Sequence, residues 1–403
     1  MANKRDGGRV KPGVEFLQMA GRSLGRVTRD VEAMVDMGEK MGKLMLEGGG
    51  LYAVGVAKWF PSEMCHRAGG LMGIKGGMPV AKKDIGYFAL PDPRWWEAHT
   101  DETLKKLMKG KGELFVVGRE EELVGVDRKR FSGFTGGASV EEGIGELAGR
   151  KPWVGVRHLE QFVRGWITLG EALGMCTRAE RMPMLWMSVW LEGGLVRNNH
   201  FVRHDNLREP WGTEMFHERV FVPALARGYV AGEFLREVER IRSVLLGQAE
   251  KLEQAGRWMA AAVKGGKKVH AVSVGHSHPA ILELDKTADF PVRWAGSVSD
   301  LNKAVPEDLG KGDVALHWGY SPVDWADVKR ILDRGVKFVY SSPYGKRPAM
   351  REHENLLWID LPWRPADATV DIPGYSVRLC PMSSSAQAMA LGAVMAEMAA
   401  GLK

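Results

Sequence analysis

Two histidines and a serine follow a short apolar run in the second half of the chain, within the stretch VSVGHSHPA at residues 272–280. The apolar run is typical of a β-strand, and the residues directly after it are Gly275, His276, Ser277 and His278. Imidazole rings and a hydroxyl group in this position are compatible with four arrangements. These are a metal site, a nucleophile with its base, an anion-binding loop at the start of a helix, and a simple helix cap.

The spacing of these residues argues against the first two arrangements. No cysteine or carboxylate stands at ligand spacing beside His276 and His278. A serine and a histidine that are adjacent in the chain rarely fold back onto each other, and the sequence has no nucleophile-elbow pattern. An anion-binding loop therefore fits best, with a helix cap as the plain alternative, and we expect neither a metal ion nor a cofactor.

A glutamate stands eight residues after the loop glycine, at Glu283, and the same spacing separates Gly55 from Glu63. Burial among apolar residues such as those in PAILELD raises the pKa of a carboxyl group. A raised pKa suits a general base that works beside a carbonyl group. An exposed carboxylate on a helix is the alternative interpretation for both glutamates.

These two stretches belong to a longer internal repeat. The glycines and the glutamates share an offset of 220 (275 − 55 and 283 − 63), which falls to 200 further along (311 − 111). Three more pairs follow in the same order: Arg94-Trp95 with Arg293-Trp294, Lys111 with Lys311, and Pro183 with Pro381. We predict a duplicated chain with units at 1–205 and 206–403, joined through a polar stretch near 199–232.

Strands and helices are predicted to alternate within each unit. In the second, helical periodicity covers 234–263 and 383–402, and strand patterns cover 268–274, 313–318, 336–342 and 356–361. This alternation favours a parallel sheet with helices on both faces, in which ligands bind beyond the carboxyl ends of the strands.

Further hydroxyl groups stand where such a sheet would present them to a ligand. Ser341 and Ser342 close a predicted strand, and three consecutive serines open the closing helix: Ser383, Ser384 and Ser385. A single serine suffices to cap a helix, so three in a row favour an anion-binding role, with simple capping as the alternative.

Composition limits the class of protein. The 403 residues carry a formal net charge of +6 with scattered basic residues, which suits an anionic small molecule better than a nucleic acid. The three cysteines are too few and too widely spaced for a disulfide framework. Because no signal peptide and no apolar run of membrane-spanning length is present, we expect a cytoplasmic protein without a membrane partner.

The sequence resembles the sugar-isomerase (SIS) superfamily of phosphosugar-binding domains in GHSHPAILE and in ADATVDIPGYSVRLCPMSSSAQ. It is similar to a bacterial branch of uncharacterised SIS proteins that joins a Gly-His-Ser-His loop, a glutamate eight residues after the glycine, and Arg-Ala-Gly-Gly. This chain divides that pattern between its copies. The second copy has the loop and Glu283, and the first has Glu63 and the RAGGL that begins at Arg67.

The resemblance implies two tandem flavodoxin-like three-layer α/β/α sandwiches and a phosphosugar ligand. Phosphate contacts would come from Ser277 and from the three serines of the closing helix. Many SIS units also have a Ser-x-Ser-Gly-x-Thr loop, where this chain has HWGYSPVD with Ser321 as its hydroxyl. The first copy departs further, so the second is expected to hold the working loop.

By the same resemblance, the expected activity is aldose–ketose isomerisation of a sugar phosphate. Glu283 would move the proton, His276 or His278 would open the ring or polarise the carbonyl, and Glu63 or Arg67 would reach the site from the neighbouring unit. A phosphosugar sensor without turnover and an etherase or lyase are the alternatives. SIS proteins usually assemble, so a homodimer is expected.

Overall fold

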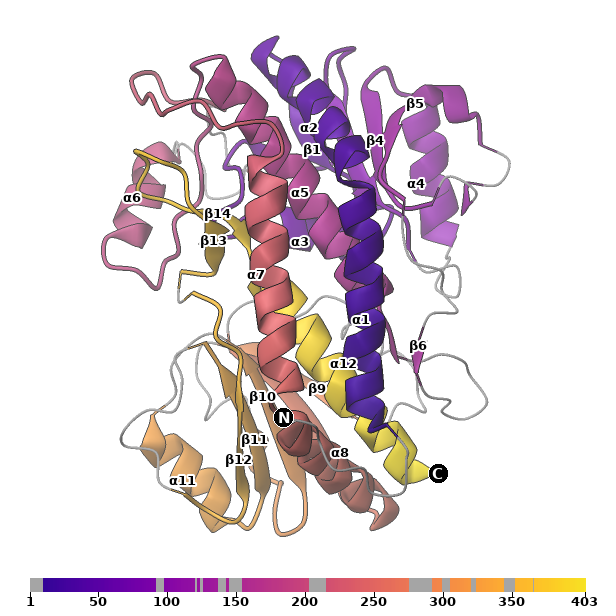
Figure 1. Cartoon of the computed structure of the whole chain (residues 1–403), viewed down its shortest axis with the longest axis vertical. Coiled ribbons are helices and arrows are strands. Elements are labelled where there is room, and N and C mark those ends of the chain that lie inside the picture. Colours follow the sequence, from indigo (N-terminus) through magenta and orange to yellow (C-terminus); the bar gives the residue numbers. More distant parts are fainter. Residues whose placement is uncertain are drawn as a thin grey trace.

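The computed structural model places two parallel β-sheets at opposite ends of an elongated molecule (Figure 1). It describes residues 10–91, 98–119, 122–123, 126–136, 143–144, 154–202, 215–274, 292–298, 305–319, 324–343, 352–364 and 366–403. The first sheet lies in the upper half of Figure 1 and the second lies in the lower half.

Both sheets have five parallel strands in the same spatial order. The first contains β1 (Leu51–Ala53), β2 (Ile74–Gly76), β3 (Ile85–Ala89), β4 (Glu113–Val117) and β5 (Phe131–Phe134), ordered β2-β1-β3-β4-β5. The second contains β8 (Val269–Val274), β9 (Arg293–Val298), β10 (Val314–Gly319), β11 (Lys337–Ser342) and β12 (Leu356–Asp360), ordered β9-β8-β10-β11-β12. Numbered within each unit, both orders are 2-1-3-4-5, the flavodoxin-like pattern. This confirms the predicted fold class and the duplication.

Ten α-helices surround the two sheets in the described part of the chain. They are α1 (Pro12–Arg29), α2 (Val31–Leu46), α3 (Phe60–Met64), α4 (Ala98–Lys109), α5 (Arg157–Arg178), α6 (Gly194–Phe201), α7 (Tyr229–Leu246), α8 (Ala249–Lys264), α11 (Trp325–Asp333) and α12 (Ser383–Leu402). Two short antiparallel hairpins pair β6 (Gly143–Ile144) with β7 (Val154–Gly155) and β13 (Ala368–Val370) with β14 (Leu379–Pro381). A 3-10 turn spans Arg128–Arg130.

One difference from the sequence prediction concerns the helix expected over 234–263. The chain forms two helices there, because α7 ends at Leu246 and α8 begins at Ala249, with Gly247 and Gln248 between them. The side chain of Gln248 bonds the backbone of Asp360 at the end of β12, donating to its carbonyl and accepting from its amide at 2.8 Å each. The break therefore fastens the helix pair to the edge of the second sheet.

Helices cover both faces of the second sheet, as the sequence predicts for a doubly wound unit. α8 packs against β8, β10 and β12 and also along α12, while α11 packs against β11 from the other side. Every residue of β10 is buried, as expected for a central strand of a parallel sheet covered on both faces.

Close contact between α2 and α5 organises the first unit. A methyl group on Gly38 would lie 2.6 Å from the carbonyl oxygen of Thr168, and one on Gly42 would lie 2.6 Å from that of Ala172. Both distances are shorter than any real carbon–oxygen contact, so only glycine allows the helices to approach this closely.

The two ends of the chain also meet. The N–H of Gly13 in α1 donates to the Oε1 atom of Glu397 in α12 at 2.7 Å. α1 packs along both α12 and α7, as Figure 1 shows, so the first and last helices join the two halves. The predicted boundary near 205 falls within residues 203–214, outside the described residues, and stays a prediction.

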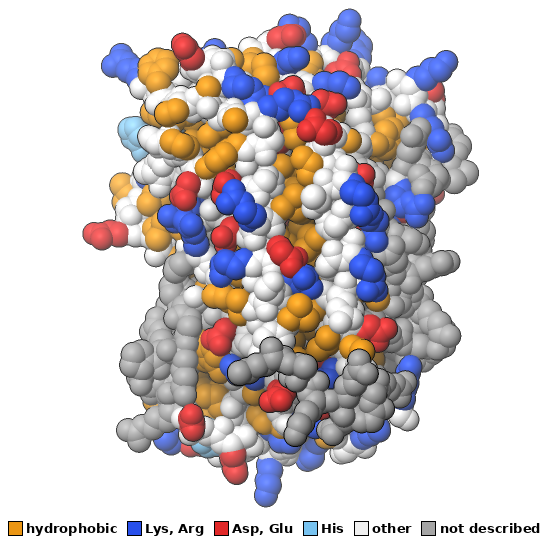
Figure 2. Space-filling model, in the orientation of Figure 1, with side chains coloured by type: hydrophobic (Ala, Val, Ile, Leu, Met, Phe, Trp, Pro, Cys, Tyr) orange, Lys and Arg blue, Asp and Glu red, His pale blue; other side chains and the backbone are white. Residues whose placement is uncertain are grey.

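The surface and the cysteines agree with the composition. Figure 2 shows basic and acidic side chains interspersed over the face formed by α1 and α7. Cys65, Cys176 and Cys380 are buried and form no disulfide. Among the described helices, none combines the length and the apolar character needed to cross a membrane.

Candidate functional site

Four residues predicted separately from the two copies meet in one buried cluster. The Nη1 atom of Arg67 lies 2.8 Å from Glu63 Oε2 and 3.0 Å from the hydroxyl oxygen of Ser384. Its Nη2 atom donates to the hydroxyl oxygen of Ser383 at 2.5 Å. Ser384 in turn donates to Glu63 Oε2 at 2.7 Å. Residues about 320 positions apart in the chain are thereby joined in one hydrogen-bond network.

The elements that hold this cluster come from both halves of the chain. Glu63 lies on α3, which follows the carboxyl end of β1, and Arg67 comes four residues later. Ser383 and Ser384 open α12, whose N-terminus lies at the centre of the molecule in Figure 1. From α5, Trp166 donates its indole N–H to Glu63 Oε1 at 2.8 Å.

Two further members of this network, Trp166 and Asp367, are not among the site residues predicted from the sequence. Asp367 Oδ2 lies 3.1 Å from Arg67 Nη2 and accepts a hydrogen bond from the Ser383 hydroxyl at 3.0 Å. Trp166 stands in no pattern that signals chemistry, and Asp367 lies within the quoted ADATVDIPGYSVRLCPMSSSAQ stretch without being singled out there. Asp367 is distinguished only by its backbone, which has a φ of +68° that is uncommon for any residue except glycine.

Asp367 also occupies the anion-binding position at the start of α12. Its Oδ1 atom accepts hydrogen bonds from the backbone N–H groups of Met382 at 3.2 Å and Ser383 at 2.8 Å. A helix N-terminus attracts an anion through its free N–H groups and its dipole. Here the protein supplies that anion itself. The third serine of the run, Ser385, is buried, and its hydroxyl oxygen has no hydrogen-bond partner.

Burial determines the electrostatics of the cluster. Glu63 is fully buried, and the loss of solvent raises the pKa of its carboxyl group above the ordinary value. The charge of Arg67 and the hydrogen bonds from Trp166 and Ser384 oppose that shift. Both oxygens of Glu63 already accept hydrogen bonds from protein groups.

The Arg-Ala-Gly-Gly pattern after Glu63 also has a structural explanation. Gly69 has a φ of +81°, and a methyl group there would lie 2.3 Å from the Cβ atom of Ala368 in β13. Its carbonyl oxygen accepts a hydrogen bond from the Cys380 N–H of β14 at 3.2 Å. The glycine lets the β13–β14 hairpin approach closely. Asp367 directly precedes this hairpin, and the hairpin leads into α12.

The other predicted residues come from the second half of the chain. Gly275, His276, Ser277 and His278, together with Glu283 and Ser321, lie outside the described residues. In the chain, Gly275 comes directly after the last residue of β8, and Ser321 comes two residues after the last residue of β10. These strands are neighbours in the sheet, and β11 follows next to β10.

Ser341 and Ser342 close β11, and both are buried. The Ser341 hydroxyl donates to the carbonyl oxygen of His317 in β10 at 2.9 Å. His317 is a third residue that the sequence analysis missed as a candidate, although it stands within the quoted HWGYSPVD stretch. It is fully buried, and burial lowers the pKa of its imidazole to about 4.

This chain resembles known proteins in its structure, whereas sequence comparison finds no match. No protein-family model matches the sequence, and no curated protein matches it. The C-terminal domain of glucosamine-fructose-6-phosphate aminotransferase from Francisella tularensis matches with a TM-score of 0.50 at 11% identity, covering 99% of this chain and 97% of that one. The chain has the tandem SIS fold.

Weaker matches include a candidate sugar-binding protein from Salmonella typhimurium LT2, with a TM-score of 0.46 at 9% identity over 96% of this chain and 98% of that one. Another is a candidate phosphosugar isomerase from Silicibacter pomeroyi DSS-3, with a TM-score of 0.43 at 9% identity over 98% of this chain and 97% of that one. The fold therefore rests on the match to the Francisella tularensis domain, and the site is argued from this chain.

In each SIS unit the first and third strands are adjacent, and the chain reverses its direction of travel across the sheet between them. This topological switch point is where doubly wound sheets bind ligands. In the second unit it lies between β8 and β10, the two strands followed in the chain by the Gly-His-Ser-His loop and by Ser321.

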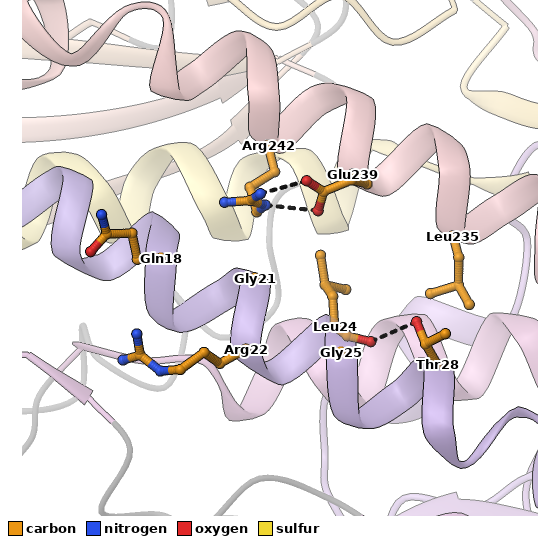
Figure 3. A pocket seen from close by; sticks show the side chains of 9 residues that line it. All are labelled: Gln18, Gly21, Arg22, Leu24, Gly25, Thr28, Leu235, Glu239 and Arg242. Carbon is orange, nitrogen blue, oxygen red and sulfur yellow. Dashed lines mark hydrogen bonds and ion pairs between the residues drawn. The ribbon is translucent and has the colours of Figure 1, made fainter. Parts of the chain in front are cut away.

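A surface hollow of about 580 Å³ lies elsewhere, between α1 and α7 of the tandem SIS fold (Figure 3). Gly21 and Gly25 of α1 form part of its wall, and Glu239 and Arg242 of α7 form an ion pair beside it. None of the predicted site residues lines this hollow.

The described part of the chain offers no group of three histidine, cysteine or acidic side chains that could hold a metal ion. His276 and His278 lie outside that part.

Proposed function

We propose that the protein binds a phosphorylated sugar at the carboxyl edge of its second sheet and interconverts the aldose and ketose forms of that sugar. The observation that carries the proposal is the strand order. The predicted loop of residues 275–278, Ser321, and the pair Ser341 and Ser342 follow or close three consecutive strands, β8, β10 and β11. The carboxyl ends of parallel strands meet at one edge of a sheet, so we expect these groups to lie near that edge.

The fold adds support for the class of ligand. The matched aminotransferase from Francisella tularensis carries fructose 6-phosphate in its name. A sugar phosphate also suits the chain's positive net charge.

The proposed chemistry is a proton transfer between the first two carbon atoms of the sugar. Glu283 would remove the proton from the carbon beside the carbonyl group, which leaves an enediolate, and would return it to the former carbonyl carbon, while the proton of the adjacent hydroxyl group passes to the carbonyl oxygen. Ser277, with the N–H groups of the loop, would bind the phosphate. His276 or His278 would assist ring opening.

Within this proposal Glu63 and Arg67 support the site from the junction of the two units. Both are buried, and the carboxylate of Glu63 accepts hydrogen bonds from three protein groups. The network fixes the start of α12, and Asp367 fills the anion position there. A ligand phosphate is therefore proposed to bind at the loop after β8.

A phosphosugar sensor without turnover is the second candidate. The HWGYSPVD stretch favours it, because this stretch replaces the Ser-x-Ser-Gly-x-Thr loop of many SIS units and Ser321 is its one serine or threonine. Under this alternative, the chain would bind the same ligands at the same edge without moving a proton.

The test is to incubate the protein in deuterium oxide with a panel of hexose and pentose phosphates and to follow deuterium incorporation at the carbon next to the carbonyl. The isomerase proposal expects incorporation by the wild type. Glu283→Gln is expected to retain binding and to lose exchange, whereas Glu250→Gln, at an exposed position on α8, should retain both. Binding without exchange by the wild type would establish the sensor, and absence of binding to every member would refute both.

A further inference from the structure

His317 is a buried imidazole with one nitrogen in use and one without a partner. Its Nδ1 atom lies 3.2 Å from the carbonyl oxygen of Ser341, which can only accept a hydrogen bond. Nδ1 therefore carries the proton in the neutral ring, and Nε2 presents a lone pair. Nε2 is buried and has no hydrogen-bond partner.

The orientation of the ring is fixed by the neighbouring strand. It stacks on Tyr340 of β11 with ring centres 4.6 Å apart and planes within 9°. Tyr340 is its direct partner in the strand register, while the hydrogen bond goes to the next residue, Ser341. The ring is thus held against β11 by its contacts with two consecutive residues.

The position of His317 in the sheet matches the proposed ligand site. β10 forms one side of the switch point, and the other side is β8, which leads into the loop that begins at Gly275. Because side chains alternate along a strand, Tyr340 and Ser342 share one face of β11. His317, stacked on Tyr340, lies on that same face.

An unprotonated Nε2 atom can bind only certain groups of a ligand. A lone pair repels phosphate oxygens and accepts a proton from a hydroxyl group. A buried acceptor without a partner is costly, and a ligand that supplies the missing donor removes that cost. The partner is thus a neutral donor group of the ligand.

We propose that Nε2 of His317 accepts a hydrogen bond from a hydroxyl group of the bound sugar. In this arrangement a residue of β10 contacts the sugar, and the loop after β8 binds the phosphate. This inference rests on the proposed function, and it adds a residue that selects among sugars by their hydroxyl groups.

Two substitutions distinguish the role of Nδ1 from that of Nε2. His317→Asn keeps an N–H donor near the position of Nδ1 and lacks any group at Nε2, whereas His317→Gln places an amide oxygen near Nε2. A matched control is His270→Asn. His270 pairs with Ala315 near the amino end of β8 and also has a nitrogen without a partner, but it lies at the far edge of the sheet.

Binding of the sugar phosphates in the panel is measured by calorimetry for each variant, with thermal unfolding as a check on folding. We expect His317→Asn to weaken binding about tenfold. His317→Gln should restore part of the affinity, and His270→Asn should leave it unchanged. A deoxy sugar phosphate that lacks the contacted hydroxyl should bind the wild type and His317→Asn equally.

The wild type alone provides a measurement that does not depend on folding of a variant. In a ¹⁵N spectrum of the histidine rings, the Nε2 signal of His317 should shift upfield when ligand is added, as expected for a new hydrogen bond to its lone pair. An unshifted signal together with unchanged affinity of His317→Asn would overturn this inference and leave the proposed function standing. Failure of every panel member to bind the wild type would overturn both.

Discussion

The guanidinium group of Arg67 and the carboxylate of Asp367 lie 3.1 Å apart, although 300 residues separate them in the chain. Both side chains are fully buried. The pair links the first SIS unit to the hairpin that leads into the closing helix of the second. Breaking a buried ion pair strongly destabilises the folded protein, because removal of one partner leaves the other charge buried without compensation.

Asp367→Asn tests this cost. The substitution keeps the size of the side chain and suits the positive φ, so its main effect is loss of the charge. We expect the free energy of unfolding to fall by about 3 kcal/mol in urea denaturation. The matched change Asp371→Asn removes an exposed partner of Arg378 and should cost under about 1 kcal/mol. Similar losses for the two variants would argue against the special role of the buried pair.

Ser383 and Ser385 offer a comparison within one turn of α12. The Ser383 hydroxyl bonds both Arg67 and Asp367, so Ser383→Ala should lower the free energy of unfolding by about 1–2 kcal/mol. Ser385→Ala removes a buried hydroxyl without a hydrogen-bond partner and should change stability by less than about 0.5 kcal/mol. Chemical denaturation measures both. If the second serine change proves as costly as the first, the described network is incomplete.

His317 should make stability depend on pH below neutrality. Burial lowers the pKa of its imidazole from 6.5 to about 4 in the folded state. The unfolded chain binds the proton more readily between these values, so this residue's contribution is present above about pH 6.5 and is lost as the pH falls toward 4. The full loss is about 3 kcal/mol.

The measurement for this prediction is the difference in unfolding free energy between wild type and His317→Asn at several pH values. That difference should shrink between pH 6.5 and 4. A difference that stays constant over this range would show that His317 titrates normally.

Two helical glycines should respond oppositely to alanine. Gly42→Ala places a methyl group 2.6 Å from the Ala172 carbonyl oxygen and should destabilise the protein by more than about 2 kcal/mol. Gly25, on α1, has no neighbouring atom closer than 4.0 Å to its added methyl group. Gly25→Ala should therefore raise stability by about 0.5–1 kcal/mol, since alanine favours helix. Thermal unfolding of both variants decides this, and a loss of stability in Gly25→Ala would contradict it.

The architecture was accessible from the sequence because it rests on local patterns. The apolar runs over 268–274 and 336–342 become β8 and β11, with boundaries within about one residue. The shared glycine–glutamate spacing predicted a duplication that appears as two sheets of identical strand order. The break at Gly247 and Gln248 was missed because helical periodicity continues across it, while the contact that fixes it comes from β12.

The site was accessible only in part. Sequence reasoning proposed Glu63, Arg67, Ser383 and Ser384, and their meeting depends on how the two units pack, which no local pattern encodes. Asp367 is an ordinary acidic residue in the sequence, and its partners are an arginine from the other unit and the N–H groups of a helix. In the sequence His317 is one polar position in an apolar strand. Its neutral state could not be predicted there, because that state follows from burial in the folded protein.

Asp367 at the start of α12 has a consequence for how this chain could be divided. A fragment that ended before residue 367 would keep Arg67 and Glu63, while the serines and the counter-charge that Arg67 now contacts would be missing. A fragment that began after the first unit would keep Asp367 without its arginine. We therefore expect the duplicated halves to be poor independent modules, suited to co-expression and reassembly and unsuited to separate use. Each copy of the duplicated unit thus depends on the other.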